Sequence, residues 1–201
     1  MIEILFAFVL LIAAYNDAEL YDIATKTVNQ ELVNVNEDKL NTYQNDRPNI
    51  PNIPIDEEIL DYLWEKCEEN DVSYTLMLAI AKVESNFDIK AKNINKNKTT
   101  DGGLFQINSA NVKWLAELAG IKEPNVSDPY HNIDLAIELI KYERDFWLSQ
   151  GYSEEDTYWL TVYSYHRGRG NALKMASKEV WNSKYVDKVT EIKYELEGAM
   201  V

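Results

Sequence analysis

Residues 79–108, AIAKVESNFDIKAKNINKNKTTDGGLFQIN, carry the features that decide the fold. Four side chains in and just before this stretch fall at helical positions i, i+3, i+4 and i+7: Met77, Ile80, Ala81 and Glu84. They share one face of a helix, so Glu84 ends an apolar stripe that points to the core. Partial burial raises the pKa of a carboxyl group, and a protonated glutamic acid can act as a general acid near neutral pH. A structural glutamate paired with a lysine or arginine would fit the same pattern.

Three short motifs follow one another along the chain: Glu84-Ser85-Asn86-Phe87, then Gly103-Leu104-Phe105-Gln106-Ile107, then Tyr163-Ser164-Tyr165-His166-Arg167-Gly168. They resemble the E-S-x-F, G-L-M-Q-I and A-Y-N-A-G motifs of the lytic transglycosylase (SLT, lysozyme-like) domain. Each motif alone has low specificity, but their shared order and spacing make the resemblance specific. It covers about residues 55–197 and implies a mostly α, lysozyme-like SLT helical domain with an active-site cleft.

The resemblance also implies a chemistry for Glu84. SLT enzymes cleave the MurNAc-β-1,4-GlcNAc bond of peptidoglycan with a single carboxyl group. By this analogy Glu84 protonates the leaving O4 and then takes a proton from the C6 hydroxyl of the muramic acid, whose oxygen attacks C1. The product is a 1,6-anhydro ring, and no water is consumed. The nucleophile is already part of the substrate, so it replaces the second carboxylate that an ordinary glycoside hydrolase needs.

The same resemblance assigns binding or positioning roles to seven residues: Ser85, Gly103, Phe105, Gln106, Asn132, Tyr165 and His166. Tyr165 would donate a hydrogen bond to Glu84, and Ser85 would orient the acid or the sugar. Gly103 would let the backbone approach the glycan closely, because glycine has no Cβ. Gln106 would hydrogen-bond the N-acetyl or hydroxyl groups of the sugar. A buried tyrosine, a helix-end serine and a solvated glutamine are the structural alternatives.

At several positions the chain departs from the family pattern or leaves a role open. Phe105 replaces a methionine and would keep the substrate wall apolar. Asn132 matches an asparagine of the family's N-P-x-x-N-I stretch and either lines the cleft or makes structural bonds. His166 replaces asparagine and Arg167 replaces alanine, beside the predicted partner of the acid. Arg167 and Arg169 would either meet a carboxylate of peptidoglycan or remain solvated.

Upstream of the domain, the N-terminal part has a different composition. Residues 4–14 are continuously apolar but too short to span a bilayer comfortably. We interpret residues 1–15 as a signal peptide or short membrane anchor, which implies export to the cell envelope, although no Lys or Arg precedes the run. A docked N-terminal helix is the alternative. Residues 16–53 are a polar extension that ends in a proline-rich linker, and residues 54–201 are the SLT domain.

Capping signals predict the helices of the domain. Asp56 would begin a helix to about Asn70, and Ser73 would cap the helix 74–85 that carries Glu84. Further helices are predicted from Asn108 or Ser109 to Gly120, from Asp128 to about Gln150, after Ser153, and as a final helix that includes residues 185–196. The last helix carries Tyr185, Val189, Ile192 and Leu196 on one face. Residues 89–100 are predicted to be a surface loop on the rim of the cleft, and no strand pattern of useful length is present.

Composition excludes several other functions. A formal net charge of −14 argues against nucleic acid and anionic membranes as partners. The lone Cys67 cannot form an intrachain disulfide and is expected to be buried. Only two histidines are present and no cysteines are paired, so we expect neither a metal nor a cofactor. The expected partner is the glycan strand of peptidoglycan, and the oligomeric state stays open, with a monomer as the simpler expectation.

Two other functions remain open from the sequence. A lysozyme-like muramidase would hydrolyse the same bond with a second carboxylate, for which Asp88 and Asp101 are the candidates. A glycan-binding envelope protein would keep the fold without catalysis. The mass of the products distinguishes a transglycosylase from a hydrolase, and replacement of Glu84 distinguishes an enzyme from a binding protein.

Overall fold

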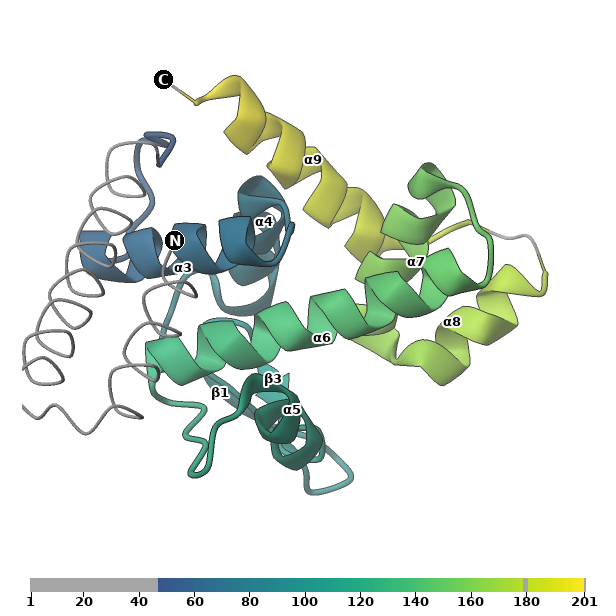
Figure 1. The fold of residues 1–201 in the computed structure, drawn as a ribbon, viewed down its shortest axis with the longest axis horizontal. Helices are drawn as coiled ribbons and strands as arrows, with labels where there is room; N and C mark the ends of the chain where they lie inside the picture. Colours follow the sequence, from purple (N-terminus) through teal and green to yellow (C-terminus); the bar gives the residue numbers. More distant parts are fainter. Residues whose placement is uncertain (1–46, 179–180, 201) are drawn as a thin grey trace, which may run out of the picture. The chain divides into compact units, whose positions relative to one another are not determined.

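The fold is mostly α, as predicted, in a computed structural model that describes residues 47–178 and 181–200. The chain from Pro48 onward forms one compact unit (Figure 1). Its elements are α3 (Glu57–Glu69), α4 (Tyr74–Ser85), β1 (Lys92–Ile94), β2 (Thr100–Gly102), β3 (Ile107–Asn108), α5 (Val112–Ala119), α6 (Pro129–Ser149), α7 (Glu154–Arg167), α8 (Arg169–Ala176) and α9 (Lys184–Gly198). The apolar run 4–14 and the extension up to residue 46 lie outside the described residues.

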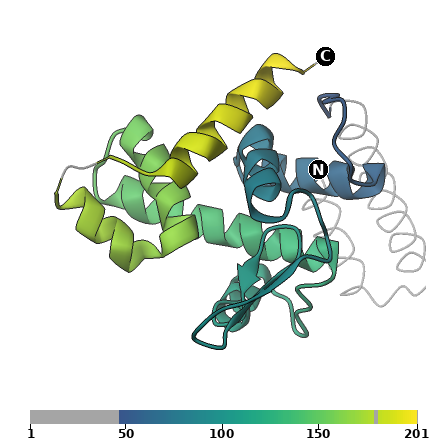
Figure 2. The same ribbon diagram turned by 180° about the vertical axis from the view of Figure 1, so that it is seen from behind.

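The long helix α6 lies at the centre of this unit. Helices α4 and α9 pack against each other along one side of α6, whereas α5 and the small sheet lie on the opposite side (Figures 1 and 2). Helices α7 and α8 pack together near the C-terminal end of α6. Helices α4 and α9, from the first and last thirds of the described chain, are thereby brought together.

Helix α4 forms for the reasons that the sequence gives. The Ser73 hydroxyl accepts a hydrogen bond from the Leu76 backbone N–H at 3.2 Å, which caps the first turn. The predicted stripe is confirmed, since Met77, Ile80 and Ala81 are fully buried. The helix ends at Asn86, whose left-handed conformation (φ 54°) stops it. Glu84 therefore lies in the last turn, at the border between the core and the groove.

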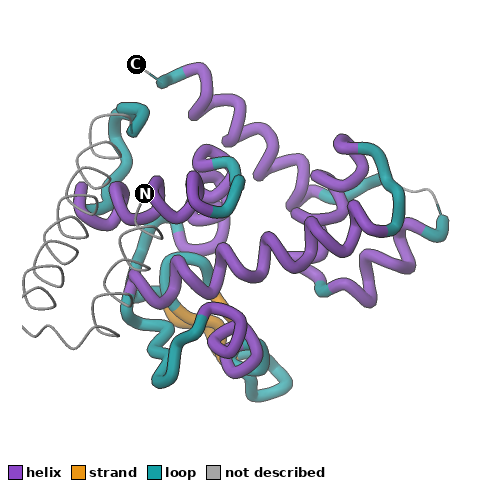
Figure 3. The backbone as a smooth tube through the Cα atoms, viewed as in Figure 1, coloured by secondary structure: helices purple, strands orange, loops and turns teal. Residues whose placement is uncertain are grey.

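Two features of the fold differ from the sequence-based prediction. Residues 89–100 are not only a loop, because β1, β2 and β3 form an antiparallel sheet (Figure 3) in which Asn93 pairs with Asp101 and Asp101 with Asn108. These strands are short and polar, so they lack the apolar alternation that reveals a strand. The second difference is α8, which was not predicted from the sequence and begins directly after Gly168 (φ 78°).

The core joins all the helices that were predicted from periodicity. Its fully buried members include Leu63 and Cys67 from α3, Ile133 from α6 and Val189 from α9. Burial of Cys67 is thus confirmed. A smaller cluster made by Trp147, Leu160, Ala172 and Ala176 holds α6, α7 and α8 together. This packing fixes the backbone positions from which the groove residues extend.

Candidate active site

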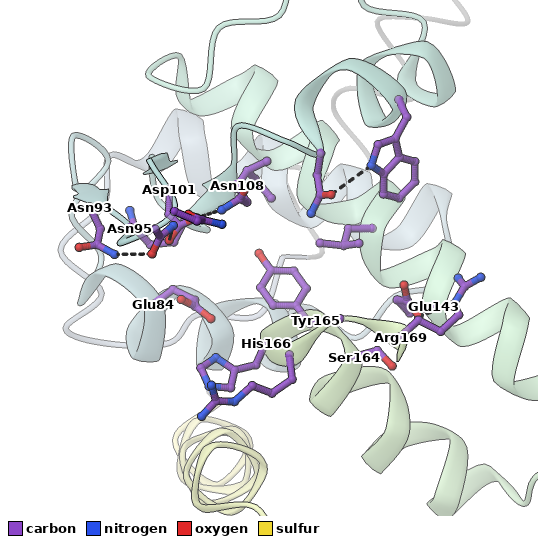
Figure 4. Close-up of a pocket in the computed structure, with 18 residues that line it drawn as sticks. Glu84, Asn93, Asn95, Asp101, Asn108, Glu143, Ser164, Tyr165, His166 and Arg169 are labelled. Atoms are coloured by element: carbon purple, nitrogen blue, oxygen red, sulfur yellow. Dashed lines mark hydrogen bonds and ion pairs between the residues drawn. The ribbon is translucent and has the colours of Figure 1, made fainter. Parts of the chain in front are cut away.

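A groove of about 840 Å³ opens beside Glu84 (Figure 4). Its walls come from α4, the sheet and the loop between β1 and β2, α5, α6 and α7: Glu84, Asn93, Asn95, Asn97, Asp101, Gln106, Asn108, Trp114, Leu139, Glu143, Tyr165, His166, Arg167 and Arg169 are among the lining residues. Amides and Asp101 lie at one end, and Glu143 and Arg169 at the other. A volume of this size suits an extended ligand with several polar groups.

Glu84 faces this groove with one strong hydrogen bond and no ion pair. The carboxylate Oε1 accepts a hydrogen bond of 2.6 Å from the Tyr185 hydroxyl. None of the ion pairs between described residues involves Glu84. The structural alternative of a glutamate neutralised by lysine or arginine therefore does not apply to it.

Burial raises the pKa of Glu84 to about 7. The hydrogen bond from Tyr185 opposes this rise, and the negative charge of Asp101 adds to it. A carboxyl group with this pKa is protonated in a large fraction of molecules at neutral pH. Glu84 can then both give and take a proton there, which is what general acid–base catalysis requires.

The tyrosine that contacts Glu84 is not the one that the motif indicated. The prediction that Tyr165 donates to Glu84 is wrong, because its hydroxyl donates to the Phe105 carbonyl at 2.6 Å. Tyr165 nevertheless lines the groove, and Glu84 acts on it electrostatically. Burial, followed by the charge of Glu84, raises the pKa of Tyr165 and of Tyr185 far above neutral pH. Both phenols therefore stay protonated and act as donors.

Tyr185 was missed as a site residue, although the sequence held a signal for it. The periodicity of the last helix placed its side chain on the inward face, with Val189 and Ile192. Its contact with Glu84 joins residues 101 positions apart. No local pattern reports such a contact, so only the packing of α9 on α4 reveals it.

His166 lines the groove and also covers Tyr185. The two rings stack with centroids 4.0 Å apart and planes inclined by 6°. Burial against its neighbours, and then the charge of Arg167, lowers the pKa of His166. The imidazole is therefore neutral at neutral pH. No contact in the structure tests its predicted role in binding substrate.

Three of the predicted binding residues, Gly103, Phe105 and Asn132, form a buried structural unit that we call the Asn132 group. The Asn132 side chain is fully buried; it accepts from the Phe105 N–H at 2.8 Å and donates to the carbonyls of Gly102 and Val126 at 2.9 and 3.1 Å. Both amide hydrogens are used, and the oxygen already accepts a backbone bond inside the core, so the structural alternative holds.

The close approach at Gly103 is likewise internal. A Cβ on Gly103 would lie 2.3 Å from the Val126 carbonyl oxygen and 2.4 Å from Asn132 Nδ2, and its φ is +76°. The glycine therefore makes room for Asn132, where the prediction had a glycan. Phe105 is fully buried and lies outside the groove lining, so the prediction that it forms a substrate wall is wrong.

Gln106 and Ser85 have different positions relative to the groove. Gln106 lines it, but its side-chain N–H group donates to the carbonyls of Ala91 and Gly103. Its side-chain carbonyl is the atom left for a ligand. Ser85 donates to the Ala81 carbonyl at 3.0 Å and is not part of the lining. This bond ties Ser85 to its own helix, and its predicted orienting role is not supported by a contact with Glu84.

A second carboxylate, Asp101, lies in the same groove and acts electrostatically on Glu84. Two side-chain amides hold it: Asn95 Nδ2 at 2.9 Å and Asn108 Nδ2 at 2.6 Å. The other sequence candidate, Asp88, accepts from the Lys90 N–H and does not line the groove. The sequence left Asp88 and Asp101 as equivalent candidates, and the structure places only Asp101 in the groove.

The far end of the groove is built around a fixed arginine. Arg169 donates to Glu143 at 2.9 Å and to the Tyr142 carbonyl at 3.0 Å. Its guanidinium also lies about 4 Å from the ring centroids of Tyr142 and Phe146. Arg169 is thus bonded within the fold to a carboxylate of the protein itself, and the predicted contact of Arg167 with a carboxylate of peptidoglycan stays a prediction.

The fold and the groove define a lysozyme-like helical domain, and the sequence places it in a family. Residues 61–187, more than half of the chain, match the family described as Transglycosylase SLT domain. The chain therefore belongs to this family, and the resemblance drawn from the three motifs is confirmed.

Similar proteins from two bacteria give the relationship more detail. Protein IpgF of Shigella flexneri is 31% identical over 106 residues, which are 52% of this chain and 64% of that protein. Invasion protein IagB of Salmonella typhimurium (strain SL1344) is 27% identical over 125 residues, 60% of this chain and 73% of that protein. The chain thus spans just under two thirds of the length of IpgF.

Two further properties of the described residues concern membranes and metal ions. No helix within 47–178 and 181–200 has the length and apolar character needed to cross a bilayer. Over the same ranges, no three His, Cys, Asp or Glu side chains are grouped so that they could hold a metal ion.

Proposed function

We propose that the protein is a peptidoglycan lytic transglycosylase with Glu84 as its catalytic acid. One observation carries the proposal: Glu84 faces a groove of about 840 Å³ with a pKa near 7 and a tyrosine donor at 2.6 Å. Membership of the SLT family supports the substrate class. The bond cleaved is the β-1,4 bond from MurNAc to GlcNAc, and the new ends are 1,6-anhydromuramic acid.

In the first half of the reaction, the protonated Glu84 gives its proton to the glycosidic oxygen as the C1–O bond breaks. The muramic ring takes on oxocarbenium character, and Glu84 becomes a carboxylate. The Tyr185 hydroxyl stabilises that charge through the hydrogen bond already in place. The groove therefore needs no reorganisation at the moment when charge develops.

In the second half, the Glu84 carboxylate takes the proton of the muramic C6 hydroxyl. The freed oxygen bonds to C1 and closes the 1,6-anhydro ring, so the proton that left Glu84 is restored and no water is consumed. A pKa near 7 suits both directions of transfer. Tyr165 and Gln106 are the lining residues proposed to contact the sugars, and His166 also lines the groove.

A second function, hydrolysis of the same bond, is favoured by Asp101. Glycoside hydrolases use two carboxyl groups that flank the bond. Asp101 lines the same groove, acts electrostatically on Glu84 and is held by two amide donors. In this alternative Asp101 would stabilise the sugar cation or activate water.

Mass analysis of fragments released from purified peptidoglycan tests both functions. A transglycosylase gives fragments one water lighter than those of a hydrolase, without a reducing end. We expect these anhydro products from the native chain and none from Glu84→Gln. Persistence of wall cleavage in that variant would overturn the assignment of Glu84, and binding to peptidoglycan without any cleavage by the native chain would indicate a glycan-binding protein.

A matched pair of carboxylate variants separates the two mechanisms. Asp101→Asn removes the charge and one of the two oxygens that accept from Asn95 and Asn108, whereas Asp88→Asn changes an exposed carboxylate outside the groove. If hydrolysis is the function, Asp101→Asn abolishes activity. If transglycosylation is the function, the anhydro products persist at a reduced rate, and Asp88→Asn behaves as the native chain in both cases.

The proposed substrate requires export of the chain to the cell envelope. Residues 1–15 are the proposed signal peptide or short anchor, and residues 16–53 the linker to the domain 54–201. Fractionation of expressing cells, with sequencing of the mature N-terminus, tests this. A full-length chain that stays in the cytoplasm would contradict export.

A further inference from the structure

His166, Tyr185 and Glu84 form a continuous line of contacts that we call the Glu84 group. The His166 ring from the end of α7 stacks on the Tyr185 ring from the first turn of α9, with centroids 4.0 Å apart. The hydroxyl of the same tyrosine donates to Glu84 on α4 at 2.6 Å. Three helices thus meet through one phenol.

The body of α9 is fixed by other bonds, further along the helix. The Tyr158 hydroxyl of α7 lies 3.1 Å from the Thr190 hydroxyl, and Thr75 of α4 donates to Glu197 at 3.1 Å. Neither bond acts on the side chain of Tyr185, which is only half-buried at the groove end of the helix. The Tyr185 ring packs against the main core, and the His166 imidazole lies parallel to it with the ring centroids 4.0 Å apart.

We propose that His166 is a positioning residue, whose stacked imidazole holds the Tyr185 ring in the orientation that directs its hydroxyl to Glu84. This inference rests on the proposed function, in which Glu84 is the acid. Parallel aromatic rings restrict each other's rotation because tilting either ring loses the stacking contact. Asparagine, which the A-Y-N-A-G motif has at this place, carries no ring and could not stack.

The charges around His166 are consistent with a neutral stacked ring. Arg167 on its own helix is the charged group that acts on the imidazole, and Tyr185 on α9 covers one of its faces. Glu84 lies beyond Tyr185, at the hydroxyl end of the phenol. Because a neutral imidazole stacks without bringing a charge to the acid, the line of contacts persists across the neutral pH range.

Three substitutions at one position test the proposal in the full-length chain: His166→Ala, His166→Phe and His166→Asn. Cleavage of soluble glycan strands is followed as kcat and KM across pH. We expect His166→Ala and His166→Asn to lower kcat by about tenfold, the effect of losing one aromatic pair, with little change in KM. The high-pH limb of the profile should shift to higher pH, because Glu84 loses the hydrogen bond that lowers its pKa.

His166→Phe keeps a flat ring and should recover most of the lost kcat and the original pH profile. A merely space-filling role would not move the pH profile, and a direct contact between His166 and substrate would change KM and would not be rescued by phenylalanine. Either result would overturn the proposal, as would native behaviour of His166→Ala.

A readout without substrate keeps this test separate from the proposed function. The pKa of Glu84 is measured by NMR of its side-chain carboxyl carbon in the native chain, His166→Ala and His131→Ala. The control removes the only other histidine, which lies outside the groove. A higher Glu84 pKa in His166→Ala alone supports positioning even if no wall cleavage is found, and an unchanged pKa rejects it even if Glu84 proves catalytic.

Discussion

The Glu84 group and the Asn132 group both contain residues of the family motifs but differ in what their polar atoms do. In the Asn132 group the side-chain oxygen and both amide hydrogens of Asn132 are bonded to backbone. In the Glu84 group one carboxyl oxygen is bonded to Tyr185, and the carboxyl faces a groove. A buried amide that is bonded to the backbone stabilises a fold, whereas a carboxyl group that faces a groove is available for chemistry. Substitutions in the two groups should therefore have opposite effects.

The largest effect is expected for Glu84→Gln, which should lower activity by about a thousandfold, the contribution of a general acid. It should also stabilise the fold at high pH. The folded-state pKa of Glu84 is raised from 4.5 to about 7, so the native carboxyl favours folding below its unfolded pKa and this contribution is lost as pH rises through 7. The loss corresponds to roughly 3 kcal/mol at most.

Thermal unfolding of the native chain and Glu84→Gln at pH 5 and pH 8 measures this. We expect a higher Tm for the variant at pH 8 and a much smaller difference at pH 5. Glu117→Gln, an exposed change on α5, is the matched control and should show neither effect. An equal Tm at pH 8 would mean that Glu84 is solvated, contrary to the comparison.

Gly103→Ala should act in the opposite way, through stability. The new Cβ would meet the Val126 carbonyl and the Asn132 side chain at φ +76°, so the free energy of unfolding should fall by about 3 kcal/mol or more. Gly151→Ala is the control, because its φ of +81° is similar but the space around it is open. That variant should lose only about 1 kcal/mol in denaturant titration. Equal losses would show that backbone conformation, and not crowding, makes Gly103 necessary.

Asn132→Ala tests whether the Asn132 group acts through stability. It leaves the Phe105 N–H and two carbonyls buried without a partner, which should cost about 2–3 kcal/mol of stability. Activity per folded molecule should change little, because Asn132 contacts no groove space. Asn125→Ala, at an exposed position, should change stability by less than about 0.5 kcal/mol. A loss of kcat in Asn132→Ala without a loss of stability would return Asn132 to the substrate site.

The smallest effect is expected for Tyr185→Phe, which removes only one hydroxyl from the Glu84 group. The hydrogen bond lowers the pKa of Glu84, so its loss should raise that pKa above about 7 and extend activity to higher pH. The rate should fall by about tenfold, because the carboxylate loses a charge-assisted hydrogen bond. The control is Tyr158→Phe. Tyr158 is a tyrosine of α7 whose hydroxyl bonds to Thr190 on α9, and its loss should leave the pH profile unchanged.

Much of the Glu84 side of this comparison could be predicted from the sequence. Periodicity placed Glu84 at the end of a buried stripe, and capping residues such as Ser73 gave the helix bounds. The sheet of β1, β2 and β3 was not predicted, because its short strands lack apolar alternation. Hydrogen bonds among the side chains of Asn95, Asp101 and Asn108 hold this region together instead. Motif matching indicated Tyr165 as the donor to Glu84, but side-chain direction within α7 sends its hydroxyl to the Phe105 carbonyl.

The dual nature of the motifs explains the remaining errors. Gly103 and Asn132 were interpreted as cleft residues because they belong to family motifs near the acid. Sequence similarity reports that a residue type is needed at a position, and it does not report whether substrate or backbone needs it. Only the distances around Gly103 and the three bonds of Asn132 distinguish the two cases.

The donor to Glu84 belongs to α9, 101 residues after the acid and in the last of the described helices. A ribosome releases the chain from its N-terminal end, and domains complete their packing as late segments emerge. A nascent chain therefore exposes Glu84 well before Tyr185 exists. For an enzyme of the proposed kind, the order of translation alone delays maturation of a wall-cutting centre until α9 has been synthesised.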